Sequence, residues 1–157
     1  MTYKELHIEE FKSFQPKIFE LITDTYVMSF RISIKEAQAI CFDKTSSLEN
    51  YIDNGSAVVI GCVEENNLLG IIWVYVHEFF GEKRLHVNQI AVDKKQRGKG
   101  IGKNLIYEAE KKAVYLGITT IDLFVSEVNE KALNLYDSLG FETERRYMRK
   151  VLQVSKK

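Results

Sequence analysis

The chain has 157 residues, of which 45% are hydrophobic and 28% are charged, and its 22 Lys and Arg residues balance 22 Asp and Glu residues. This length and composition are typical of one globular domain, which we expect to cover residues 1–157 and to need neither disulfides nor a structural metal. The zero net charge argues against a basic nucleic-acid-binding protein, so any positively charged site has to be local.

Neither the cysteines nor the apolar stretches suggest a secreted or membrane protein. Cys41 and Cys62 form no CxxC pair and are too few for a disulfide framework, so we expect reduced thiols and a cytoplasmic protein. The N-terminal residues are polar and lack the apolar core of a signal peptide. No stretch approaches the roughly 18 apolar residues of a membrane helix, and we expect no membrane partner.

The first third of the chain predicts one strand and two helices. Residues 3–8 are typical of a short strand. Ser13, followed closely by Pro16, indicates the start of a helix, because proline is tolerated in the first turn. Residues 34–51 predict a second helix, interrupted near residues 45–47.

The middle of the chain predicts three strands. Residues 56–64 are rich in β-branched side chains, and residues 68–77 are again strand-like. The Asn66-Asn67 turn between them indicates a β-hairpin. Residues 84–92 form a third predicted strand, which follows a turn at Gly81.

The last third predicts two helices, each followed by an extended segment. Apolar residues recur with helical spacing from Ile101 until Gly117 ends the helix, and residues 118–126 predict a strand. Asn129 is expected to cap a short helix that runs through Leu139, and residues 141–152 predict a last extended strand.

This order of elements predicts the fold class. The strand, helix and strand of residues 84–126 are expected to form a right-handed crossover with parallel strands, whereas the earlier strands should be antiparallel. We therefore predict an α/β (α+β) fold in which about four helices flank a mixed, mostly antiparallel sheet.

The loop between strand and helix, residues 93–106 (DKKQRGKGIGKNLI), has the features of an anion site. The first N–H groups of a helix have no partner within the helix, and the helix dipole adds positive charge there. Glycines allow a diphosphate to approach the bare backbone, and Arg97, Lys99 and Lys103 can add charge-assisted hydrogen bonds. The loop therefore predicts a phosphate-binding site.

Two common phosphate motifs do not fit this loop. A P-loop needs four residues between its glycines and then Lys followed by Ser or Thr, but three residues separate Gly98 from Gly102, and Asn104 follows Lys103. The dinucleotide motif GxGxxG needs a third glycine, and counting from Gly98 that position holds Lys103. Both motifs are excluded.

A third pattern does fit. Residues 97–102 (RGKGIG) match R/Q-x-x-G-x-G/A, the acyl-CoA loop of the GNAT (GCN5-related) N-acetyltransferases, and residues 90–92 (IAV) resemble the strand end before it. Residues 129–141 (NEKALNLYDSLGF) resemble the N-x-x-A-x-x-L-Y-x-x-x-G-F segment of the same family. The element order agrees across nearly the whole chain, so the sequence resembles a GNAT acetyltransferase.

The resemblance implies how the donor, acetyl-CoA, is bound. The glycine loop is expected to hold the pyrophosphate mainly through backbone N–H groups, and the pantetheine arm to pair with the strand before the loop, as an added strand would. The strand that begins at Ile118 should splay away and leave the cleft. The expected cofactor-binding residues are Ile90, Ala91, Val92, Arg97, Gly98, Lys99, Gly100, Ile101, Gly102, Lys103, Asn129, Ala132 and Tyr136.

The resemblance also implies catalytic roles. Tyr136 corresponds to the general acid that protonates the departing thiolate, although burial in an apolar face would equally explain a tyrosine there. Asn129 corresponds to a cofactor-contacting asparagine, and a plain helix cap is the alternative. Backbone N–H groups near residues 90–92 are expected to meet the oxyanion. Because transfer is expected to be direct, in a ternary complex, neither cysteine need act as a nucleophile.

The general base is the weakest part of the pattern. Relatives often place a glutamate on the strand before the loop, where this chain has His86 and Asn88. His86 is the candidate base, since imidazole changes its charge near neutral pH, and Glu78 or Glu82 acting through water are alternatives. The histidines show no metal-ligand spacing such as HExxH, so we expect no metal.

The acceptor is expected to be a primary amine on a small molecule or a peptide, in a monomer or homodimer. The resemblance implies that residues 26–33, 78–83 and 145–148 form the acceptor wall. Two other functions were weighed: a non-catalytic acyl-CoA-binding sensor on the same fold, and a nucleic-acid contact through the basic loop. We expect no nucleic acid, because the loop has no aromatic residues among its basic ones.

Overall fold

The computed structural model describes residues 1–153. Its elements in chain order are β1 (Thr2–Glu5), α1 (Ile8–Phe30), α2 (Ile34–Asp53), β2 (Val58–Glu64), β3 (Asn67–Phe79), β4 (Glu82–Val92), the short 3-10 helix η1 (Lys94–Gln96), α3 (Ile101–Tyr115), β5 (Ile121–Leu123) and α4 (Glu130–Ser138).

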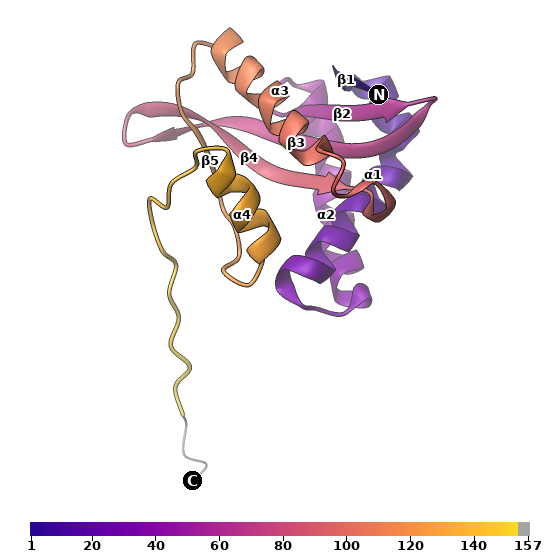
Figure 1. Ribbon diagram of the computed structural model, residues 1–157. Coiled ribbons are helices and arrows are strands. Elements are labelled where there is room, and N and C mark those ends of the chain that lie inside the picture. The colour runs from indigo at the N-terminus through magenta and orange to yellow at the C-terminus, as the bar shows by residue number, and fades with distance from the viewer. Residues whose placement is uncertain (154–157) are drawn as a thin grey trace.

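The strands form one twisted sheet in the order β1-β2-β3-β4-β5 (Figure 1). The pairs β1–β2, β2–β3 and β3–β4 are antiparallel, whereas β4 and β5 are parallel and are joined by the crossover helix α3. The β2–β3 hairpin turns at Glu65 and Asn66, which both have positive φ. The predicted mixed, mostly antiparallel sheet is therefore confirmed.

Helices cover both faces of the sheet. One core lies between the sheet and the helices α1 and α2, where Phe11 and Ile18 pack with Cys41 and Leu48. The other core lies on the face that α3 and α4 cover (Figure 1). It contains buried side chains such as Leu105 of α3. The four helices predicted to flank the sheet are present, and each buries one side on it.

Helix α1 begins earlier than predicted. It starts at Ile8, so Pro16 lies inside the helix rather than in its first turn. The carboxylate of Glu10 accepts a hydrogen bond from the backbone N–H of His7, which stabilises the earlier start. The missing N–H of Pro16 costs one helical hydrogen bond, and the buried apolar face of α1 outweighs this cost.

Helix α2 is continuous, and the predicted interruption near residues 45–47 is wrong. The hydroxyl groups of Thr45, Ser46 and Ser47 donate hydrogen bonds to backbone carbonyls three or four residues earlier, at distances of 2.8–3.3 Å. These hydroxyl groups are satisfied within the helix, so they do not break it.

The C-terminal third departs most from the predicted strands. Only residues 121–123 of the predicted strand 118–126 pair with β4. Within the described residues, the segment 141–153 forms no strand, and it runs away from the sheet in Figure 1. Charged residues crowd this segment without a regular apolar alternation, so it has no face to bury on the sheet.

Among residues 1–153, no helix combines the length and the apolar composition that a bilayer crossing requires.

Candidate active site

A cleft opens where β4 and β5 part. The two strands pair only from Leu85 to Val87 and from Ile121 to Leu123, while β4 continues to Val92. Within the described residues, the end of β4 therefore has no partner on the β5 side. The separation agrees with the splayed strands expected from the sequence, and it exposes an edge of backbone groups to which an extended ligand can bind.

A β-bulge interrupts β4 just before the cleft. Trp73 pairs with Gln89 and Val74 with Val87, so Asn88 is an extra residue in β4. A bulge increases the local twist and re-aims the side chains that follow it. The Asn88 side-chain oxygen is buried and has no hydrogen-bond partner within residues 1–153. It is an acceptor that faces the interior beside the cleft.

The glycine loop connects the end of β4 to α3. The backbone N–H of Lys95 donates to the side chain of Asp93 over 2.9 Å, which starts the turn η1. Gly98 and Gly100 both have positive φ, near 80°, a conformation that strains residues with a Cβ atom. Gly100 is the N-cap of α3, so the first N–H groups of the helix face the loop without a capping side chain.

Several charged side chains of the loop hold its own structure. The Arg97 guanidinium donates to the Val92 carbonyl over 3.0 Å and lies 2.6 Å from the sulfur of Met28. The Lys99 ammonium donates to the side chain of Gln96 over 2.7 Å. Asp93 binds Lys17 of α1 over 2.6 Å, and this ammonium lowers the pKa of the Asp93 carboxyl. Backbone groups are thus the more available donors at the loop.

A cavity of about 410 Å³ lies between the end of β4, the glycine loop, α1 and α4. It brings together most of the predicted cofactor-binding residues. Those that line it are Ile90, Val92, Arg97, Gly98, Gly100, Ile101, Gly102, Lys103, Asn129, Ala132 and Tyr136. Thus the loop and the segment 129–136, which are far apart in sequence, share one cavity.

Three predicted residues lie outside this cavity. Ala91 is buried in the core beneath α1 and α2, on the other face of β4. Lys99 is exposed on the outer side of the loop. His86 lies four residues before Ile90 along β4, deeper in the sheet. Conversely, the α1 side chains Thr25, Met28 and Ser29 line the cavity.

Asn129 links α4 to α1 across the cavity. Its side-chain oxygen accepts the backbone N–H of Ala132 over 3.2 Å, so it caps α4. Its side-chain nitrogen donates to the hydroxyl of Ser29 over 3.1 Å. The helix-cap interpretation of Asn129 is confirmed, and its contact with a cofactor stays a prediction.

Tyr136 lies on α4 between the cavity and the core. Its side chain is buried and packs against Phe141, with ring centroids 5.5 Å apart. Burial raises the pKa of Tyr136 to about 12. The phenol therefore keeps its proton at neutral pH, as a proton donor must.

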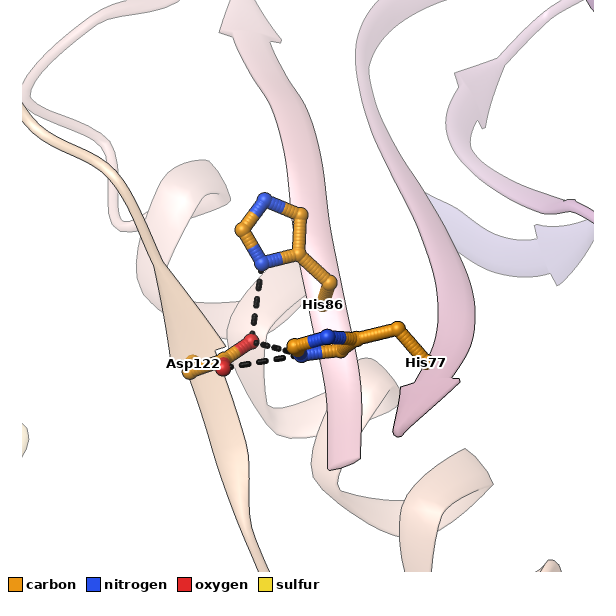
Figure 2. Close-up of side chains that lie close together, drawn as sticks. All are labelled: His77, His86 and Asp122. Carbon is orange, nitrogen blue, oxygen red and sulfur yellow. Dashed lines mark hydrogen bonds and ion pairs between the residues drawn. The ribbon is translucent and has the colours of Figure 1, made fainter. Parts of the chain in front are cut away.

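Three polar side chains converge where β4 and β5 begin to part (Figure 2). His77 of β3 and His86 of β4 both contact the carboxylate of Asp122 on β5. The His86 Nδ1 atom lies 2.8 Å from Asp122 Oδ1, and the His77 Nε2 atom lies 2.9 Å from Oδ2. No local sequence pattern indicates this cluster, because strand pairing brings its members together.

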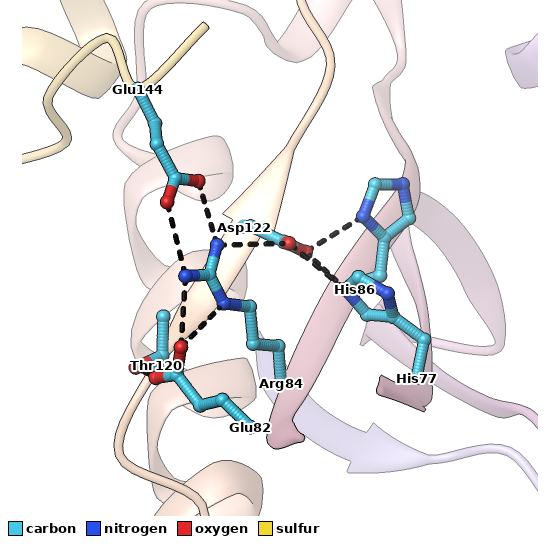
Figure 3. Close-up of polar contacts among 7 residues, drawn as sticks. All are labelled: His77, Glu82, Arg84, His86, Thr120, Asp122 and Glu144. Atoms are coloured by element: carbon cyan, nitrogen blue, oxygen red, sulfur yellow. Dashed lines mark hydrogen bonds and ion pairs between the residues drawn. The ribbon is translucent and has the colours of Figure 1, made fainter. Parts of the chain in front are cut away.

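A guanidinium extends this cluster into a network (Figure 3). Arg84 lies 3.7 Å from Asp122 and donates two hydrogen bonds to Glu144, at 2.7 and 3.1 Å. It also donates to Glu82 over 2.9 Å, and the short contact from Thr120 to Glu82 completes the network. The two glutamates raise the pKa of Arg84. Glu144 thereby attaches the C-terminal segment to the sheet.

Two imidazoles and a carboxylate are also a ligand set for zinc or iron. The donor atoms of His77, His86 and Asp122 all lie within 4.8 Å of one another. However, the positive charge of Arg84 beside Asp122 opposes a second cation. The cluster is therefore better suited to sharing protons than to holding a divalent metal.

The two cysteines lie apart from the cavity. Cys41 packs in the core under α1 and α2, and Cys62 packs in the core under α3. Burial raises the pKa of both thiols. Neither residue is therefore suited to act as a nucleophile, since the thiolate is the reactive form.

Known proteins resemble this chain in sequence and fold. An uncharacterized N-acetyltransferase, YdgE of Bacillus subtilis (strain 168), is 26% identical over 157 aligned residues that cover 96% of this chain and 98% of YdgE. A mycothiol acetyltransferase of Propionibacterium freudenreichii is 33% identical over 78 residues, half of this chain. The chain spans about a quarter of that relative.

Two solved structures share the fold. A GCN5-related N-acetyltransferase from Ralstonia eutropha JMP134 superposes with a TM-score of 0.80 at 18% identity, over 96% of this chain and 97% of that one. A predicted acetyltransferase from Clostridium acetobutylicum, solved with acetyl-CoA, gives 0.69 at 15% identity, over 96% and 95% of the two chains. The sequence match that establishes the family extends well beyond the two short motifs. Residues 16–141 match the Acetyltransferase (GNAT) family, and the chain belongs to that family.

Proposed function

We propose that the protein is an acetyl-CoA-dependent N-acetyltransferase that moves the acetyl group directly to a primary amine in a ternary complex. The observation that carries this proposal is the cavity at the end of β4, which the glycine loop and the segment 129–136 line together. The second support is the end of β4 beside it, which pairs with β3 but, within the described residues, has no partner on the β5 side.

The cavity fits the parts of a coenzyme A thioester. Gly98 and Gly100 leave bare backbone at the start of α3, where a diphosphate can accept hydrogen bonds from N–H groups. Lys103 lines the same cavity and adds positive charge. The backbone of residues 90–92 offers the groups with which an amide-containing arm pairs in the manner of a strand. The thioester supplies the activated acetyl group.

The chemistry requires a base and an acid. An alkylammonium has no lone pair, so a base has to remove its proton before attack, and we assign this role to His86. The departing sulfur takes a proton, and we assign its delivery to Tyr136. This phenol is protonated at neutral pH, because burial raises its pKa to about 12. The role of Tyr136 follows the family resemblance, whereas the role of His86 follows from its imidazole on the strand where relatives often carry a glutamate.

The acceptor wall is expected on the side of α1 and the β3–β4 turn. The guanidinium of Arg145 lies over the rings of Phe79 and Phe80, at 4.4 and 5.5 Å from their centroids. This contact brings two of the predicted wall segments, 78–83 and 145–148, together. We propose a small amine with some apolar bulk as acceptor. The name of mycothiol acetyltransferase supports a small-molecule acceptor, and the aromatic wall residues support the apolar bulk.

The test has two stages. A thermal melt with acetyl-CoA, compared with pantetheine, which lacks the diphosphate, measures donor binding. Thiol release is then followed over a panel of amines: 2-phenylethylamine, spermidine, glucosamine, lysine and a peptide with a free N-terminus. Stabilisation together with turnover supports the proposal. Stabilisation without turnover on any amine would favour a non-catalytic acyl-CoA-binding module, and no stabilisation would refute both.

A further inference from the structure

One carboxylate serves two histidines on three adjacent strands. His86 and Asp122 are direct partners in the parallel pairing of β4 and β5. His77 lies on β3, which borders β4 on the side away from β5. The His86 side chain is only 8% exposed, so its contact with Asp122 is shielded from water. A surface salt bridge is usually weak, whereas a shielded hydrogen bond of 2.8 Å can fix the orientation of an imidazole ring.

The contact also fixes the tautomer of His86. An ionised carboxylate only accepts hydrogen bonds, so the nitrogen that faces it has to carry the proton. The guanidinium of Arg84, 3.7 Å from Asp122, stabilises the negative charge of that carboxylate. In its neutral form His86 therefore carries its proton on Nδ1, which leaves the lone pair on Nε2. Figure 2 shows this second nitrogen pointing away from Asp122.

His86 lies at the point where the cleft begins. It is the residue before Val87, the last residue of β4 that pairs with β5. Its neighbours Leu85 and Val87 point into the core under α3, so the His86 side chain lies on the opposite face of the sheet. There its ring is 5.2 Å from that of Phe124, whose side chain is largely exposed.

We propose that Asp122 is a positioning residue, which holds His86 with Nε2 free to take a proton from the acceptor amine. This inference rests on the proposed function. The alkylammonium N–H bond breaks, and its proton moves to His86 Nε2 and then to solvent. The lone pair left on nitrogen attacks the thioester carbonyl carbon. As the C–S bond breaks, nitrogen gives its second proton to His86, which has released the first to solvent. Tyr136 protonates the sulfur and regains its proton from solvent, so coenzyme A leaves as the thiol and one proton is released overall.

His77 has a supporting place in this arrangement. By the same reasoning it donates from Nε2 to Asp122, and so it clamps the carboxylate from the second side. The titratable and charged groups around His86 are Tyr75 and His77 on β3, Arg84 on β4 and Asp122 on β5, with Glu82 and Glu144 behind Arg84. Removing His77 should therefore lower turnover less than removing the Asp122 carboxylate.

The kinetic test compares the wild type, Asp122→Asn and His77→Gln in buffer with EDTA, using 2-phenylethylamine or the panel amine that turns over fastest. The Asp122→Asn substitution keeps the shape of the side chain, but the amide NH2 group can donate a hydrogen bond to the other tautomer of His86. We expect kcat to fall about 100-fold near neutral pH, within the range for general-base catalysis, with little change in KM for acetyl-CoA. The deficit should shrink toward high pH, because the amine is then already deprotonated. A loss that is equal at every pH would overturn the proposal.

A second measurement needs no acceptor, so it separates this inference from the proposed function. Long-range ¹H–¹⁵N spectra of the histidine rings report the tautomer. We expect the Nδ1–H tautomer of His86 in the wild type and its loss in Asp122→Asn. An Nε2–H tautomer in the wild type would refute the inference even if the enzyme is active. Tight Zn²⁺ binding that Asp122→Asn abolishes would assign the cluster to a metal and overturn it as well.

Discussion

Gly100 provides a sharp test of the glycine loop, because another glycine serves as its matched control. Gly100 and Gly117 stand at opposite ends of α3 with φ of 79° and 71°, and in each a Cβ atom would meet no atom within 4 Å. Alanine in this conformation costs about 1–2 kcal/mol at either site. In a chain of this size that lowers Tm by about 2–8 °C. Gly100→Ala and Gly117→Ala should therefore destabilise the free protein equally.

Only Gly100→Ala should weaken acetyl-CoA binding, since Gly100 lines the cavity and the new methyl group would occupy the approach of the diphosphate. Losing one charge-assisted hydrogen bond costs about 1.5–3 kcal/mol, or roughly 10- to 150-fold in Kd. At a ligand concentration of about 100 times the wild-type Kd, acetyl-CoA stabilises the wild type and Gly117→Ala by about 2.7 kcal/mol. Gly100→Ala should then retain about 0.3–1.4 kcal/mol. Equal ligand-induced shifts in the two variants would refute the placement of the diphosphate.

Three further predictions concern other parts of the molecule. Tyr136→Phe should lower kcat with little effect on acetyl-CoA Kd, and equal turnover would return Tyr136 to a packing role. Because burial raises the pKa of Tyr136 to about 12, its protonated form favours the folded state. This stabilisation is complete below the unfolded pKa of about 10 and is lost as pH rises toward about 12, a loss on the order of 2–3 kcal/mol. The free energy of unfolding in urea should therefore fall more between about pH 9 and pH 11 for the wild type than for Tyr136→Phe. Glu144→Ala should leave Tm nearly unchanged but speed tryptic cleavage at Arg145, because Glu144 is the residue of this segment that pairs with Arg84 in the described structure. Glu142→Ala is the matched control and should not speed cleavage; identical cleavage rates in the two variants would contradict this anchoring role.

The fold was predictable where its signals are local in sequence. The turn at Asn66, the helix end at Gly117 and the cap at Asn129 each depend on residues within a few positions of one another, and the structure has all three. The predicted start of α1 at Ser13 is wrong, because a proline can sit inside a helix whose buried face is strong enough. The predicted strand at residues 141–152 is wrong as well, since strand formation depends on a partner that the segment itself does not specify.

The two sides of the site differ in what sequence can predict, and the reason is physical. The proposed donor site uses backbone N–H groups and the conformational freedom of glycine, so it needs a fixed spacing such as that of Gly98 and Gly100, and a short motif records it. The proposed proton-accepting site uses side chains that three strands bring together. His77, His86 and Asp122 become neighbours only through the registers of β3, β4 and β5.

A chain of the same family can therefore keep the donor-binding motif while its acceptor-side residues differ, and the motif does not reveal the difference. The strand on which relatives often carry a glutamate has His86 and Asn88 here, and a carboxylate reaches His86 from β5 as Asp122. An imidazole held by a carboxylate can take up a proton as a strand glutamate would. In this arrangement the negative charge belongs to Asp122, which contacts His86, and not to the group that would face the substrate. Under the proposed function the acceptor would meet an imidazole edged by Tyr75 and Phe124, an arrangement that favours an amine with apolar bulk over a highly charged polyamine.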